Sequence, residues 1–177
     1  MKSYYSIIFS MSLVILFGLP GTGKTYVGKI FEKYLAYHFY DGDNDLTPEM
    51  NYAIKTKTVF TEQMRDIFFA KLIKSIFDLK SKHKKLVVAQ TFIKERYRTD
   101  LIKKIPEAKF ILIKTKKSIR EKRLAQRTEL PLNIDYARKM VSNFDQPMID
   151  HLKIVNDADD EENIRKQIMS ILAGWGG

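Results

Sequence analysis

The stretch Gly18-Leu19-Pro20-Gly21-Thr22-Gly23-Lys24-Thr25 decides the fold of this chain. It fits the pattern G-x-x-x-x-G-K-[ST], in which a glycine-rich loop points backbone N–H groups at phosphate oxygens. An apolar run from Ser12 to Phe17 precedes the loop, and a helical pattern from Tyr26 to Leu35 follows it. Because a buried strand, a glycine loop and a helix in this order form a phosphate site, we predict that the chain binds a nucleoside triphosphate.

The loop residues have separate expected roles. Lys24 is expected to bridge the β- and γ-phosphates, and the Thr25 hydroxyl to take one coordination position on Mg²⁺. The predicted cofactors are therefore ATP and Mg²⁺. The remaining contacts to the phosphates are expected from Gly18, Pro20, Gly21, Thr22 and Gly23.

Composition limits the class of protein. A chain of 177 residues with 45% hydrophobic content predicts one domain over residues 1–177, with residues 1–10 as a short extension and Met11 as an alternative start. The chain has no cysteine, which excludes disulfides and zinc–thiolate sites and favours a reducing, cytoplasmic setting. No apolar run reaches the length of a membrane helix.

The net charge of +10 is ordinary surface charge in our interpretation. It comes mostly from scattered lysines, with no aromatic residues between them on which bases would stack. We expect neither a membrane nor a nucleic acid as partner, and we expect the chain to act as a monomer or a homodimer on a small anionic molecule.

Apolar runs alternate with helical patterns along the whole chain. Further strands are predicted at 37–40, 86–89, 110–113 and 153–155, and helices at 61–80, 94–105, 118–127, 134–144 and 160–172. The spacing from Ser118 to Glu121 is that of a capping box, and a small lid is expected over about 120–133. This order predicts an α/β, three-layer fold of the P-loop kinase type, with a five-stranded parallel sheet and helices on both faces.

Two aspartates follow the second predicted strand. Ligands of open parallel sheets bind beyond the carboxyl ends of the strands. Asp41 and Asp43 are two residues apart, so in an extended stretch both carboxylates face the same way. One can hold the metal and the other can orient or deprotonate an attacking hydroxyl. The alternative is an Asp-Gly turn with solvated carboxylates.

Arginines offer bidentate contacts to phosphate and carboxylate groups. Arg123 and Arg127 lie one turn apart before the 128–133 loop, where a lid would bring a cation to the transferred phosphoryl group. Either could instead be an exposed helix charge. Arg65, early on the long helix, is a candidate for binding an anionic acceptor, although an ion pair with Glu62 or Asp66 is an equal alternative.

From about Leu13 to Leu172 the chain resembles the gluconate kinase and shikimate kinase group. The similarity to gluconate kinase is the greater, because shikimate kinase has several glycines where this chain has Ala89-Gln90-Thr91. The segments that resemble gluconate kinase are Asp41-Gly42-Asp43, Lys94 to Leu101, Ile113 to Arg127 and Met140 to Pro147.

This resemblance implies roles for particular residues. It places Lys24 and Thr25 on MgATP, Asp41 near magnesium, and Arg127 in the lid. The acceptor is assigned to Asp43, Arg65 and Gln90, and adenine to Arg123 and the loop near Asn156 and Asp157. The segment from Thr58 to Asp66 keeps the arginine of gluconate kinase but lacks most of its acids, which leaves the acceptor open.

The leading hypothesis is an ATP-dependent kinase that phosphorylates a hydroxyl of a small anionic acceptor, such as the sugar acid gluconate. Lys24, Mg²⁺ and Arg127 would stabilise the phosphoryl oxygens while Asp43 orients the hydroxyl. The alternatives are a nucleotide or polynucleotide kinase, or a shikimate kinase-like enzyme. A nucleotide switch is disfavoured because the chain has neither D-x-x-G nor N-K-x-D. The intact loop and paired aspartates argue against an inactive binding module.

Overall fold

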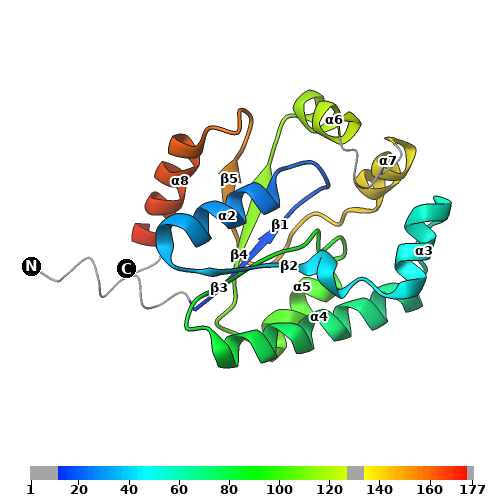
Figure 1. The fold of residues 1–177 in the computed structure, drawn as a ribbon, viewed down its shortest axis with the longest axis horizontal. Helices are drawn as coiled ribbons and strands as arrows, with labels where there is room; N and C mark the ends of the chain where they lie inside the picture. Colours follow the sequence, from blue (N-terminus) through cyan, green and yellow to red (C-terminus); the bar gives the residue numbers. More distant parts are fainter. Residues whose placement is uncertain (1–11, 127–133, 175–177) are drawn as a thin grey trace, which may run out of the picture.

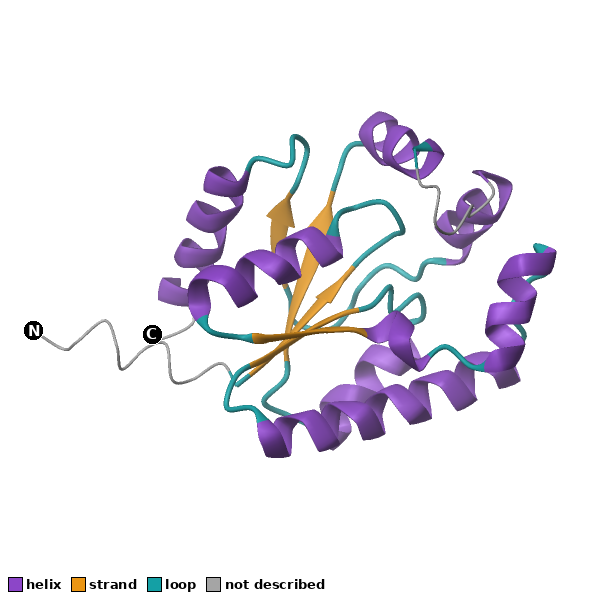
Figure 2. Ribbon diagram, viewed as in Figure 1, coloured by secondary structure: helices purple, strands orange, loops and turns teal. Residues whose placement is uncertain are grey.

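The computed structural model describes residues 12–126 and 134–174. Its centre is a parallel sheet with the strand order β2-β3-β1-β4-β5 (Figures 1 and 2). The strands are β1 (Leu13–Phe17), β2 (His38–Asp41), β3 (Leu86–Ala89), β4 (Lys109–Lys114) and β5 (Leu152–Val155).

Helices cover both faces of the sheet, with α2 and α8 on one face and α4 and α5 on the other (Figure 1). The shorter α3, α6 and α7 lie toward the edge at which the strands end (Figure 1). No helix in the described part of the chain combines the length and the apolar character that a bilayer crossing needs. The helices are α2 (Lys24–Leu35), α3 (Pro48–Thr56), α4 (Glu62–Lys82), α5 (Glu95–Lys104), α6 (Lys117–Ala125), α7 (Ile134–Asn143) and α8 (Glu161–Gly174).

The apolar run of β1 forms the middle of the core. All five of its side chains are fully buried. Val14 and Leu16 pack with residues of α2 and α8, and Leu13, Ile15 and Phe17 pack with residues of α4 and α5. A strand that is buried on both faces needs an unbroken apolar sequence, which is why this run identified it. The expected three-layer α/β fold is confirmed.

The structure corrects the prediction at three places. Helix α3 was missed, although Thr47 caps it by accepting a hydrogen bond from the Met50 N–H at 3.2 Å and Pro48 occupies its first turn. Helix α6 starts one residue before Ser118, so the proposed capping box is wrong; the Lys116 N–H donates to Asp157 Oδ1 instead.

The third correction concerns the two aspartates. Strand β2 ends at Asp41, and a short 3₁₀ helix, η2 (Gly42–Asp45), follows at once. Asp41 caps η2 by accepting from the Asp43 N–H at 3.1 Å. The stretch is therefore not extended at Asp43, and the two carboxylates point to different partners.

A fully buried arginine fixes the loop between β3 and α5. Arg98 Nε donates to Phe92 O at 2.9 Å, and Nη2 donates to Asp145 O at 2.7 Å. Its Nη1 pairs with Glu95. Phe92 has a backbone φ of 47°, a costly conformation for a large side chain, which the bond to Arg98 helps to hold. The contacts of Arg98 are therefore structural.

We expect Arg98→Met to reduce the free energy of unfolding by about 3–5 kcal/mol, because it leaves the carbonyl oxygens of Phe92 and Asp145 without this donor and Glu95 without its ion-pair partner. Urea unfolding followed by circular dichroism measures this loss. Lys103→Met, at an exposed position of the same helix, is the matched control and should change stability by less than about 0.5 kcal/mol. Equal stability of the two variants would contradict the role given to Arg98.

Candidate active site

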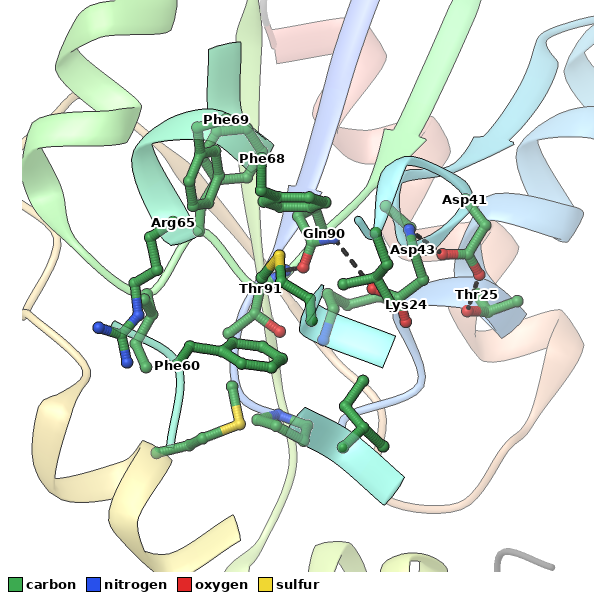
Figure 3. A pocket seen from close by; sticks show the side chains of 18 of the residues that line it. Lys24, Thr25, Asp41, Asp43, Phe60, Arg65, Phe68, Phe69, Gln90 and Thr91 are labelled. Carbon is green, nitrogen blue, oxygen red and sulfur yellow. Dashed lines mark hydrogen bonds between the residues drawn. The ribbon is translucent and has the colours of Figure 1, made fainter. Parts of the chain in front are cut away.

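A pocket opens at the carboxyl edge of the sheet, between the phosphate loop, η2, α3, the start of α4 and the loop after β3 (Figure 3). Several residues predicted from the sequence line this one pocket, although they are far apart in the chain. They are Pro20, Gly21, Gly23, Lys24, Thr25, Asp41, Asp43, Arg65 and Gln90.

The phosphate loop has a backbone that only glycine adopts easily. Gly23 has a φ of 86° and precedes the first residue of α2, and a Cβ there would lie 2.2 Å from Asn156 Nδ2. The N-terminus of α2 therefore borders the pocket, where its partial positive charge favours an anion. Lys24 Nζ donates to Gly18 O at 2.9 Å and to Leu19 O at 3.1 Å, which folds the side chain over the loop.

Residues that follow β4 and β5 hydrogen-bond to the backbone of the phosphate loop and so stabilise it. Asn156 is 1% exposed, and its Nδ2 donates to Thr22 O at 3.1 Å. Thr115 Oγ1 lies 3.1 Å from the same carbonyl oxygen. Arg123 Nη1 donates to Asn156 O at 3.1 Å, and Nη2 pairs with Asp159 at 2.9 Å. The predicted contacts of Arg123 and Asn156 with adenine stay predictions; the contacts present support the loop.

Thr25 and Asp41 form a small oxygen-rich site at the start of α2. Thr25 Oγ1 donates to Asp41 Oδ2 at 3.2 Å (Figure 3). Within the described residues, no group of three or more His, Cys, Asp and Glu side chains is placed to hold a metal. A hydroxyl and a carboxylate next to a phosphate loop nevertheless suit Mg²⁺, which takes few protein ligands and completes its shell with phosphate oxygens and water.

Gln90, the residue after β3, holds Asp43 at the pocket. Gln90 Nε2 donates to Asp43 Oδ1 at 3.0 Å, while Gln90 Oε1 accepts from the Thr91 N–H at 2.6 Å (Figure 3). The 8% exposed Gln90 thus has both ends of its amide group in use. The contact fixes one carboxylate oxygen of Asp43, and the Asp43 side chain lines the pocket.

A buried aspartate that the sequence did not reveal anchors η2. Asp45 is 3% exposed; its carboxylate accepts from Tyr40 OH at 2.9 Å and from Ser75 Oγ at 3.0 Å. Burial and the bond to Asp45 raise the pKa of Tyr40 to about 12, so this phenol remains a donor. Lys71 Nζ donates to the Asp45 carbonyl oxygen at 3.2 Å. Because Asp45 lies two residues after Asp43, it ties the element that carries Asp43 to α4.

Arg65 lines the pocket and is already paired. Its Nη1 donates to Glu62 Oε1 at 2.7 Å, and its side chain is 14% exposed. Glu62 also pairs with Arg96 at 2.8 Å, and Arg96 pairs with Asp66 at 2.7 Å. The ion pair weighed from the sequence is therefore present, and it orients a guanidinium at the pocket wall. Arg127 lies outside the described residues, as does the second half of the predicted lid, residues 127–133.

Comparisons with known proteins identify the family and the fold of the chain. Residues 20–173 match the family model described as "Shikimate kinase". No curated protein matches the sequence. Among solved structures, an unliganded sugar kinase from Janibacter sp. HTCC2649 superposes with a TM-score of 0.78 at 16% identity, over 92% of this chain and 95% of its own.

Two further structures share the fold. A gluconokinase from Sinorhizobium meliloti 1021 has a TM-score of 0.77 and 20% identity, with 95% of this chain and 94% of that chain covered. A shikimate kinase from Aquifex aeolicus vf5 has a TM-score of 0.57 and 18% identity, with 91% and 96% covered. The resemblance to the gluconate kinase and shikimate kinase group is confirmed.

We expect Asp45→Asn to lower the free energy of unfolding by about 1–3 kcal/mol, because an amide nitrogen there would face a hydroxyl donor. Since η2 would loosen, kcat should fall while KM for ATP stays within twofold. Urea unfolding and steady-state kinetics measure the two effects. The control is Asp78→Asn, on the exposed face of α4. An unchanged kcat in a destabilised Asp45→Asn protein would show that η2 does not position Asp43.

Proposed function

The chain belongs to the shikimate kinase family and is an ATP-dependent small-molecule kinase, and we propose that it transfers the γ-phosphoryl group to a hydroxyl of a small anionic acceptor. The observation that carries the proposal is one pocket in which Lys24 and Thr25 meet Asp43 and Arg65. The first pair belongs to a phosphate site, and the second suits an acceptor with a hydroxyl and a negative charge.

The phosphate side acts through position and charge. Lys24 and the N-terminus of α2 attract the phosphate oxygens, and Lys24 exchanges its carbonyl partners in the loop for them. Thr25 and Asp41 are the residues that would hold Mg²⁺. When bound, Mg²⁺ supplies positive charge to the phosphate oxygens. Arg127 completes this set in the proposal as the lid cation.

Asp43 is the residue we assign to the acceptor hydroxyl. Its Oδ1 is occupied by Gln90, so the carboxylate has a fixed orientation in the absence of substrate. A carboxylate held in this way accepts a hydrogen bond from the hydroxyl and directs its oxygen toward the γ-phosphorus. It receives the proton as the new O–P bond forms, while the bond from the γ-phosphorus to the bridging oxygen breaks and ADP leaves. Gln90 therefore serves the acceptor indirectly in this account.

Arg65 is the residue we assign to the negative charge of the acceptor. It lines the pocket, and Glu62 holds its guanidinium in place from outside the pocket lining. Sugar acids such as gluconate belong to this class of acceptor and are the first compounds to test. We place the reaction in the cytoplasm, where ATP is available, with the chain acting as a monomer or a homodimer.

The first test is release of ADP from MgATP with gluconate, shikimate or a nucleoside monophosphate as acceptor. Acceptor-dependent release should occur with wild-type protein and fall at least about 100-fold in Lys24→Ala, because the phosphates lose their main side-chain charge. The Lys29→Ala variant, at an exposed position of the same helix, is the control. Turnover that survives Lys24→Ala would contradict the phosphate site.

A second test separates the two aspartates. Asp43→Asn should lower kcat by about 100-fold or more, because an amide cannot take the proton of the hydroxyl. Asp41→Asn should instead raise the Mg²⁺ concentration needed for half-maximal rate, because it weakens a metal ligand. Magnesium titrations of both variants measure the difference. Near-wild-type kcat in Asp43→Asn would show that the base is assigned to the wrong residue.

A further inference from the structure

The acceptor side of the pocket is mostly apolar. Beyond Asp43, its wall comes from side chains of α3, of the segments just before and after α3, of α4 and α7, and of the loop after β3, and the polar groups are few. The phosphate side, by contrast, is made of backbone and polar groups. The apolar lining on which the argument rests is Leu46, Met50, Ile54, Phe60 and Phe68.

Two polar side chains of this wall, Gln90 and Arg65, already have protein partners. Gln90 uses both ends of its amide on Asp43 and on the Thr91 N–H. Arg65 shares its charge with Glu62. A polyhydroxylated chain such as gluconate loses a water partner at each hydroxyl that it buries, and each lost partner costs free energy unless the protein replaces it. This wall replaces few of them, so it disfavours an open-chain polyol.

Aromatic rings dominate the space beside Arg65. Phe60 and Phe68 lie on different sides of the cavity, with Arg65 at one end, on the side of Phe60, and Lys24 toward the other end (Figure 3). Phe68 is 4% exposed and forms a firm wall, since its ring meets Phe69 edge-on. Phe60 directly precedes Thr61, the N-cap residue of α4, and is only partly buried. Its side chain lines the pocket. Such rings favour another flat ring packed edge-on or offset.

We propose that the acceptor is an anion that carries both an aromatic ring and an alcohol, and that this alcohol receives the phosphoryl group. The ring packs against Phe60 and Phe68, the hydroxyl meets Asp43, and the anionic group meets Arg65. This inference rests on the proposed function and narrows its acceptor. A free aromatic acid and a nucleotide both carry this chemistry, and the experiment distinguishes them.

The test is titration calorimetry of the full chain saturated with Mg²⁺ and the non-hydrolysable analogue AMP-PNP. The probes are 4-(hydroxymethyl)benzoate, adenosine 5′-monophosphate and gluconate. At least one aromatic probe should bind about tenfold more tightly than gluconate, because its ring removes apolar surface from water. Tighter binding of the benzoate identifies a free aromatic acid as the source, and tighter binding of the monophosphate identifies a nucleotide.

Variants test whether the ring contact is the cause. Phe60→Ala should weaken the preferred aromatic probe about tenfold and leave gluconate within twofold. Phe77→Ala, at a 47% exposed phenylalanine of α4 outside the pocket, is the matched control and should change neither. Tighter binding of gluconate, no binding of either aromatic probe, or full affinity in Phe60→Ala would overturn the inference.

Turnover with MgATP separates this inference from the proposed function. Phosphorylation of gluconate with a higher kcat/KM than either aromatic probe would overturn the aromatic acceptor and leave the kinase activity standing. Tight, Phe60-dependent binding of an aromatic probe, with no phosphate transferred to any of the three compounds, would support the ring site and count against the proposed transfer.

Discussion

The carbonyl oxygen of Thr22 is the point on which the phosphate site depends. Asn156 donates to it from the end of β5, and Thr115 contacts it from the end of β4. These contacts hold the loop in a conformation that carries a φ of 86° at Gly23 and sets the start of α2 against the pocket. Residues at the ends of β4 and β5 thus fix the direction of the N–H groups of the loop. The loop in turn fixes the positions of Lys24 and Thr25, the first two residues of α2.

The two sides of the pocket are built by different physical means. The phosphate side uses backbone dipoles and a lysine, which suit the spread charge of phosphate oxygens. The acceptor side uses apolar walls, with a carboxylate and a guanidinium each held by a protein partner. Asp45 under η2 and Glu62 beside Arg65 hold these two groups before substrate arrives. In the transfer that we propose, such fixed partners would reduce the reorganisation needed as the phosphoryl group moves.

The sequence predicted what is encoded locally. The strands were found because strands buried on both faces, such as β1, need apolar runs, and the pocket edge followed from parallel topology. Asp45 and Arg98 were missed as anchors because their partners lie far away in the chain, at Ser75 and Asp145. The expectation that the carboxylates of Asp41 and Asp43 face the same way was wrong, because the spacing of two residues does not reveal the 3₁₀ helix that starts between them. Helix α3 did have a local signal, Thr47-Pro48, which was overlooked.

The most direct test of this account is the affinity of MgATP for Gly23→Ala, measured by calorimetry beside the wild type. An alanine at this position is strained by the positive φ of 86°, and its methyl group would also clash with the side-chain amide of Asn156. We expect a variant that is folded by circular dichroism and whose affinity for MgATP is about tenfold or more below that of the wild type, because the loop must leave its conformation. Wild-type affinity in this variant would contradict the claim that the phosphate loop, in the conformation of this structure, binds the nucleotide.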